Sequence, residues 1–146
     1  MKTNLLLLCL NILFVTACAS SPFSLSRVAA PVQAQLDQPF TLGLGQAAHL
    51  SSEDLTITFL EMRADSRCPS EVNCAERGQA VVFIQAQRGD LPSSTFELND
   101  NPPLKADTAS YENYHLQFVD LSPYPKRPDE SIPLRDYSVT LLVSPF

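Results

Sequence analysis

The chain has 146 residues, of which 45% are hydrophobic and 18% charged, with 12 prolines, 4 cysteines and no tryptophan. This length allows one domain and leaves little room for a second, and prolines spread over the whole chain exclude a helical bundle, because proline breaks helix interiors. The net charge of −6 argues against a nucleic-acid-binding surface, which needs a basic patch.

The first segment, residues 1–17, has the pattern of a signal peptide. Residues 5–15 are almost entirely apolar, but they are too few to cross a bilayer as a mature helix. The residues that follow, Val15-Thr-Ala-Cys18, resemble the lipobox of bacterial lipoproteins. This resemblance implies cleavage before Cys18, a diacylglyceryl group on its thiol and a fatty acid such as palmitate on the new amine. The alternative is an ordinary signal peptide cut after Ala17-Cys18-Ala19.

Cleavage before Cys18 would change both the charge and the location of the protein. Removal of residues 1–17 from the 146 leaves 129 residues and takes away Lys2, so the net charge changes from −6 to −7. Two or three acyl chains anchor a protein more firmly than one, and we therefore expect a lipid-anchored protein of the bacterial cell envelope. An Asp after the lipid site would resemble an inner-membrane retention signal. Ala19 stands there instead, which favours the outer membrane in a Gram-negative source, facing the periplasm or the surface.

Residues 18–36 are expected to form the lipidated cysteine and a flexible tether. The segment mixes Ser, Ala, Pro and Gln without a regular hydrophobic period. As a flexible coil it would hold the following domain on the order of 25 Å from the anchor. The sequence leaves open whether part of this segment is instead a first strand.

Residues 37–146 contain short β-prone runs separated by Pro, Gly, Asn and Asp. Leu55, Ile57 and Phe59 alternate with threonine, which predicts a strand with one buried face. Residues 79–86 are apolar on both faces and predict a central strand. The predicted strands cover residues 40–44, 46–50 (the least regular), 55–61, 79–86, 95–98, 114–118 and 137–143.

Six or seven strands without a convincing helix predict an all-β domain, an antiparallel β-sandwich of immunoglobulin-like or similar type. A sandwich is favoured over a small barrel because the loops vary in length and strand 79–86 needs cover on both faces. Residues 99–110 are predicted to be a long polar connection. Residues 122–133 contain four of the prolines and are predicted to be an exposed, stiff loop before the last strand.

Two cysteines remain after removal of the signal peptide and assignment of Cys18 to the lipid. Cys68 and Cys74 are six positions apart, and in an oxidising compartment such a pair favours a disulfide. The alternative is a zinc site that adds His49 and His115 as ligands. A Cys-x5-Cys spacing is not usual for zinc, and both histidines are far away in the sequence.

No catalytic motif was found. His49 and His115 are the candidate general bases, but neither lies in a recognisable nucleophile motif, and the carboxylates are scattered singly. The oxygen-rich turns at 99–101 and 129–130 lack the spacing of a calcium loop. We therefore predict that the protein is not an enzyme and has no cofactor, metal or small-molecule substrate, with an envelope enzyme or metal binder as an alternative.

One segment resembles a known group of proteins. Asp65-Ser-Arg-Cys-Pro-Ser-Glu-Val-Asn-Cys-Ala-Glu-Arg-Gly-Gln-Ala80 is similar to the pattern D-S-R-C-P-x-x-V-x-C-x-W-x-G-x-A of small secreted bacterial lipoproteins of unknown function. With the flanking strands, the resemblance covers residues 40–143. Glu76 stands where these proteins usually have Trp. The resemblance implies architecture and location, and it implies no activity.

The predicted function is a non-enzymatic binding or structural module of the envelope, held on the membrane by its lipid. Loops on a rigid sheet usually carry function, so the predicted contact surfaces are residues 65–78 and 122–133. An inhibitor or accessory subunit that docks the disulfide loop into an envelope enzyme is the alternative, because a constrained loop loses little entropy on binding. The predicted exposed contacts are Arg67, Glu71, Glu76 and Arg77.

Overall fold

The computed structural model describes residues 30–101 and 106–146. The predicted signal peptide, Cys18 and most of the segment 18–36 lie outside the described residues. Within these ranges, no helix is long and apolar enough to cross a membrane.

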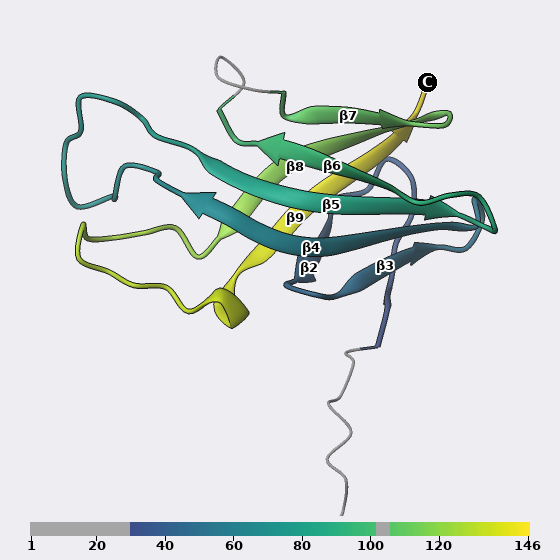
Figure 1. The fold of residues 1–146 in the computed structure, drawn as a ribbon, viewed down its shortest axis with the longest axis horizontal. Coiled ribbons are helices and arrows are strands. Elements are labelled where there is room, and N and C mark those ends of the chain that lie inside the picture. Colours follow the sequence, from purple (N-terminus) through teal and green to yellow (C-terminus); the bar gives the residue numbers. More distant parts are fainter. Residues whose placement is uncertain (1–29, 102–105) are drawn as a thin grey trace, which may run out of the picture.

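The described chain folds into nine strands and one short 3₁₀ turn, η1 (Leu134–Asp136) (Figure 1). The five-stranded sheet has the order β1-β3-β4-β5-β6, and the four-stranded sheet has the order β2-β9-β8-β7. All neighbouring strands are antiparallel except β1 and β3, which are parallel. The strands are β1 (Val32–Gln33), β2 (Phe40–Gly43), β3 (Ala47–Leu50), β4 (Leu55–Asp65), β5 (Ala80–Arg88), β6 (Ser94–Asn99), β7 (Thr108–Tyr111), β8 (Tyr114–Ser122) and β9 (Ser138–Pro145).

The two sheets enclose one hydrophobic core, which confirms the prediction of an all-β, antiparallel β-sandwich. Leu55, Ile57 and Phe59, which were predicted to point inward, are fully buried, as the period of two requires. Leu116 on β8 and Val139, Leu141 and Val143 on β9 are fully buried in the same core. Burial of these side chains is the main favourable contribution to folding, about 1.5–3 kcal/mol for each side chain of this size.

The prediction of six or seven strands was too low, because two short strands carry little sequence pattern. Val32 and Gln33, inside the segment 18–36, pair with Ala48 and His49 as β1. The strand β7 occupies the end of the segment predicted to be a polar connection, 99–110. Both strands lie at sheet edges, where one strand neighbour suffices and a short run of mixed residues can pair.

Register shifts interrupt the two longest strand pairings. On β4 they fall between Phe59 and Glu61 and between Met62 and Ala64. The strand ends at Asp65, beyond the predicted end at residue 61. On β8 a shift between Phe118 and Asp120 leaves one extra residue in that strand. Such bulges re-aim the side chains that follow them.

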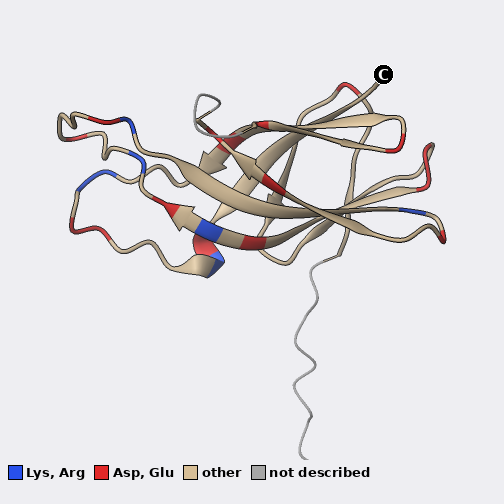
Figure 2. Ribbon diagram, turned by 45° about the horizontal axis from the view of Figure 1, so that its top comes forward, with Lys and Arg blue, Asp and Glu red and all other residues tan. Residues whose placement is uncertain are grey.

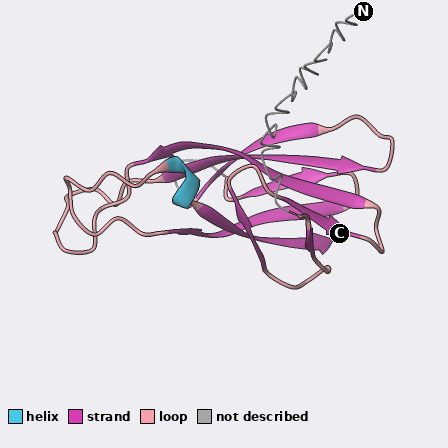
Figure 3. Cartoon of the chain, turned by 90° about the horizontal axis from the view of Figure 1, so that it is seen from below, coloured by secondary structure: helices cyan, strands magenta, loops and turns pink. Residues whose placement is uncertain are grey.

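The longest connections gather at one end of the sandwich (Figures 1 and 3). Residues 66–79 connect β4 to β5, and residues 123–137, which include η1, connect β8 to β9. We call these two connections the two-loop end. The opposite end consists of the short turns 51–54, 89–93 and 112–113.

Candidate binding surface

The disulfide predicted in the first long connection is present. Cys68 and Cys74 are bonded, with their Cα atoms 5.9 Å apart. Both sulfur atoms are used in this bond, which leaves no thiolate for the zinc alternative. Among the described residues, no three His, Cys, Asp or Glu side chains are arranged to hold a metal ion.

The two loops predicted as contact surfaces lie against each other, although they are far apart in the sequence. The Ser70 amide donates to the Pro125 carbonyl and the Glu71 amide donates to the Lys126 carbonyl, both at 3.0 Å. The Tyr124 hydroxyl donates to the Cys68 carbonyl at 3.0 Å. The disulfide loop, residues 66–79, is thus attached to the proline-rich loop, residues 123–137, by both backbone and side-chain hydrogen bonds.

Arg67 was predicted to be an exposed contact, and this was wrong, because it is only 5% exposed. Its guanidinium makes two hydrogen bonds to the Asp65 carboxylate, at 2.8 and 2.7 Å. It also donates to the carbonyls of Leu121 and Pro123, and it stacks 4.6 Å from the centre of the Tyr124 ring. A buried guanidinium needs such partners. Asp65 and Leu121 are on β4 and β8, and Pro123 and Tyr124 are in the second loop, so Arg67 braces the first loop against the second.

Two groups beside Arg67 have shifted pKa values that fit this buried ion pair. Burial works to raise the pKa of Asp65, but the hydrogen bonds and charge of Arg67 outweigh it and hold that pKa below its usual range. The Tyr137 hydroxyl donates to the same carboxylate at 3.1 Å. Burial and the Asp65 charge raise the pKa of Tyr137 to about 12. At neutral pH the cluster therefore holds one anion, one cation and a neutral phenol.

Gly78 lets the ends of the disulfide loop approach closely. Its φ is +72°, and a Cβ atom placed there would lie 1.8 Å from the Ser66 carbonyl oxygen. Next to it, the Cys68 amide donates to the Arg77 carbonyl at 2.9 Å, and the Ser66 amide donates to the Gln79 carbonyl at 2.8 Å. Only glycine permits both this backbone conformation and this distance.

The other three predicted contacts lie on the surface, as expected. Glu71 and Glu76 are exposed on the disulfide loop, and the Arg77 side chain is 64% exposed. Arg77 donates to the Asp100 carbonyl at 2.9 Å. Cys74 is exposed as well, whereas Cys68 is half-buried, so the disulfide near Glu76 is only partly covered.

Charge is distributed unevenly over the described residues (Figure 2). The two-loop end has five basic and five acidic residues and is therefore neutral. The remaining described residues have two basic and eleven acidic members, a net charge of −9. An acidic partner would be repelled by the body of the domain but not by the two-loop end.

The two histidines considered as general bases are on different sheets. His49 on β3 is 3.3 Å from the Thr56 hydroxyl. His115 on β8 is 3.4 Å from the Ser110 hydroxyl and makes an edge contact with the Phe146 ring. Each histidine thus contacts a hydroxyl on the neighbouring strand, and the fold does not bring the two together.

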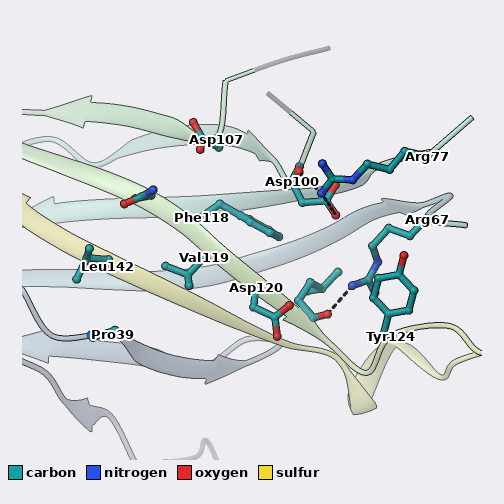
Figure 4. Close-up of a pocket in the computed structure, with 12 residues that line it drawn as sticks. Pro39, Arg67, Arg77, Asp100, Asp107, Phe118, Val119, Asp120, Tyr124 and Leu142 are labelled. Atoms are coloured by element: carbon teal, nitrogen blue, oxygen red, sulfur yellow. Dashed lines mark hydrogen bonds and ion pairs between the residues drawn. The ribbon is translucent and has the colours of Figure 1, made fainter. Parts of the chain in front are cut away.

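A groove of about 620 Å³, not foreseen from the sequence, lies on the outer side of the four-stranded sheet, next to the two-loop end (Figure 4). Arg77 and Asp100 lie near Arg67 and Tyr124 at one end of this view, with Pro39 and Leu142 at the other. Phe118, Val119 and Asp120, the residues at the β8 bulge, line the groove, and no sequence pattern predicts this bulge. The lining residues are Pro39, Arg67, Arg77, Asp100, Asp107, Gln117, Phe118, Val119, Asp120, Leu121, Tyr124 and Leu142.

No protein-family model, no curated protein and no solved structure matches this chain. The similarity of residues 65–80 to secreted bacterial lipoproteins and the lipobox at Cys18 therefore stay predictions.

Proposed function

We propose that this protein is a lipid-anchored component of the bacterial cell envelope that binds another envelope protein through its two-loop end. In this role the module is non-enzymatic. The membrane is its first partner, through the lipid on Cys18, and the bound protein is its second.

The support for the anchor is the Val15-Thr-Ala-Cys18 segment after an apolar run. Cys18→Ser is expected to release the protein from the membrane fraction and to abolish labelling by radioactive palmitate. An unlabelled wild-type protein together with a membrane-bound variant would contradict the anchor.

The observation that carries the proposed binding role is the attachment of the disulfide loop to the proline-rich loop. A long loop usually loses much conformational entropy when binding orders it. Here the disulfide, Arg67 and the hydrogen bonds of the Ser70 and Glu71 amides order the two loops before a partner binds. Between the two cysteines, the residues 70–73 are exposed, and Val72 is 39% exposed. A preordered surface that offers both charge signs and an apolar side chain suits a protein partner.

Photo-crosslinking in the native envelope tests this role. A photoreactive amino acid at Val72 is expected to give a discrete crosslinked protein that mass spectrometry identifies. The same amino acid at Asn113, an exposed residue in a turn of the opposite end, is the matched control. Equal crosslinking at both positions, or none at Val72, would contradict the proposed surface.

The second candidate function is an inhibitor that docks the disulfide loop into an enzyme cleft. The exposure of residues 70–76 at the tip of a braced loop favours it. If the protein crosslinked at Val72 is a hydrolase, the full-length protein should inhibit it. The Cys68→Ser/Cys74→Ser variant should inhibit more weakly because its loop must be ordered on binding.

A further inference from the structure

The groove beside the two-loop end has an apolar floor that an interrupted strand exposes. On β8, Phe118 pairs with Leu141 and Asp120 pairs with Thr140, so Val119 is the extra residue of a bulge. Before the bulge the even-numbered residues of β8 point into the core, and after it Leu121 does. Val119 and Asp120 are therefore both exposed, and Val119 is 48% exposed in a strand interior.

The carboxylates around this floor have few neutralising partners. Asp107 accepts a hydrogen bond from the Thr108 hydroxyl at 3.1 Å, and Asp120 accepts one from the Ser122 hydroxyl at 3.2 Å. Within the described part of the chain, neither carboxylate has a basic partner. The third, Asp100, has Arg77 beside it, at 4.0 Å between charged atoms.

The two arginines of the groove do not neutralise the negative charges of Asp107 and Asp120. Arg67 is neutralised by Asp65 in a buried ion pair at 2.7 Å, and Arg77 faces Asp100. Asp107 and Asp120 remain, within a domain body of net charge −9. Charge complementarity therefore calls for a cationic occupant.

The volume of the groove and the arrangement of its carboxylates argue for an extended cation over a metal ion. Among the described residues, no three carboxylate, imidazole or thiolate groups converge on one point. A groove of about 620 Å³ is large for a single ion and suits several residues of an extended chain. Exposed Val119 beside Asp120, with Asp107 also in the lining, matches a chain that carries both basic and apolar side chains.

We propose that this groove binds an extended, basic polypeptide segment, with an apolar side chain on Val119 and Lys or Arg side chains beside Asp107 and Asp120. The proposal does not rest on the role of the two-loop end. That role is tested by crosslinking at Val72, and a failure there would leave the groove unaffected.

The test uses the full-length protein in a neutral detergent and a fluorescein-labelled peptide, Val-Lys-Val-Lys-Val-Lys with blocked ends. Fluorescence anisotropy is expected to show saturable binding with a dissociation constant below about 1 mM. Binding should weaken with added salt. The Asp107→Asn/Asp120→Asn variant is expected to bind about fivefold more weakly, the loss typical of two exposed ion pairs.

The control variant, Asp90→Asn/Glu112→Gln, removes the same charge at the opposite end and should change the affinity less than about twofold. Four results would overturn the proposal: no binding up to millimolar peptide, equal binding of the peptide with Glu in place of Lys, equal losses in both double variants, or spermidine binding as tightly as the peptide. The last result would assign the groove to a small organic cation.

Discussion

The two ends of this β-sandwich are ordered by different kinds of contact. At one end, the turns 51–54, 89–93 and 112–113 join strands that are hydrogen-bonded neighbours, so local pairing orders them. At the two-loop end, residues 66–79 and 123–137 are long, and contacts between distant segments order them. The difference teaches that a short turn is ordered by its strands, whereas a long loop needs contacts with segments that are distant in the sequence.

The two ends also differ in what they offer to a partner. The two-loop end is neutral, whereas the rest of the described domain has a net charge of −9. The contacts of Arg67, the close approach at Gly78 and the disulfide decide whether the neutral two-loop end is a fixed surface. Substitutions that remove these contacts one at a time show how much each contact stabilises this end.

Removal of the Arg67 side chain is expected to have the largest effect. Arg67→Ala leaves Asp65 buried without its partner, and such losses cost about 3–5 kcal/mol of unfolding free energy. Arg77→Ala, which removes an exposed arginine from the same loop, should cost less than about 1 kcal/mol. Denaturant unfolding measures both values, and equal losses would show that Arg67 is no brace. If Arg67→Ala does not fold, Arg67→Lys, which keeps the charge but loses the planar fork, should still be less stable than Arg77→Ala.

Gly78→Ala is expected to cause the second-largest loss of unfolding free energy. Its Cβ would meet the Ser66 carbonyl oxygen at 1.8 Å, and the residue would keep a positive φ. Together these effects should cost about 3 kcal/mol. Gly45 has a similar φ of +77°, but a Cβ atom there would have no neighbour within 4 Å, so Gly45→Ala should cost only about 1 kcal/mol. Thermal unfolding compares the two, and similar losses would mean that the close approach is absent.

Loss of the disulfide should have a smaller effect. On the loop-entropy model, Cys68→Ser/Cys74→Ser should lower the unfolding free energy by about 2 kcal/mol. A reducing agent should produce the same loss in the wild-type protein and none in the double variant. A wild-type protein indifferent to reduction would show that the other contacts order this loop alone.

The smallest expected effect is on the acid dependence of stability. Because the folded state lowers the pKa of Asp65, the unfolded state binds the proton more readily. This contribution is complete above the unfolded pKa of about 3.9 and is lost as the pH falls through the folded pKa. Asp65→Asn should flatten the stability profile below about pH 4. An unchanged slope in Asp65→Asn would contradict the ion pair.

The sequence predicted the sandwich well where burial imposes a period of two. Leu55, Ile57 and Phe59 on β4 show the alternation because one face packs on the core. Cys68 and Cys74 were paired correctly because few cysteines remained. The bulges on β4 and β8 were not predicted, because a register shift depends on the pairing with a neighbouring strand and leaves no local sequence pattern.

The burial of Arg67 could not be read from the sequence for the same reason. Its carbonyl partners, Leu121 and Pro123, are 54 and 56 residues away, and only the folded topology brings them near. An arginine in a loop is ordinarily exposed. Local patterns report local structure, whereas this site is formed by two connections that meet in space.

Amide hydrogen exchange at Ser70 and Glu71 tests the central claim most directly, because these amides donate across the two loops. In the wild-type protein both amides should exchange slowly, nearer to those of β5 than to the exposed loop amide of Asp129. In Arg67→Lys both should lose protection while the β5 amides keep theirs. Exchange at Ser70 and Glu71 as fast as at Asp129 in the wild-type protein would contradict a preordered two-loop surface.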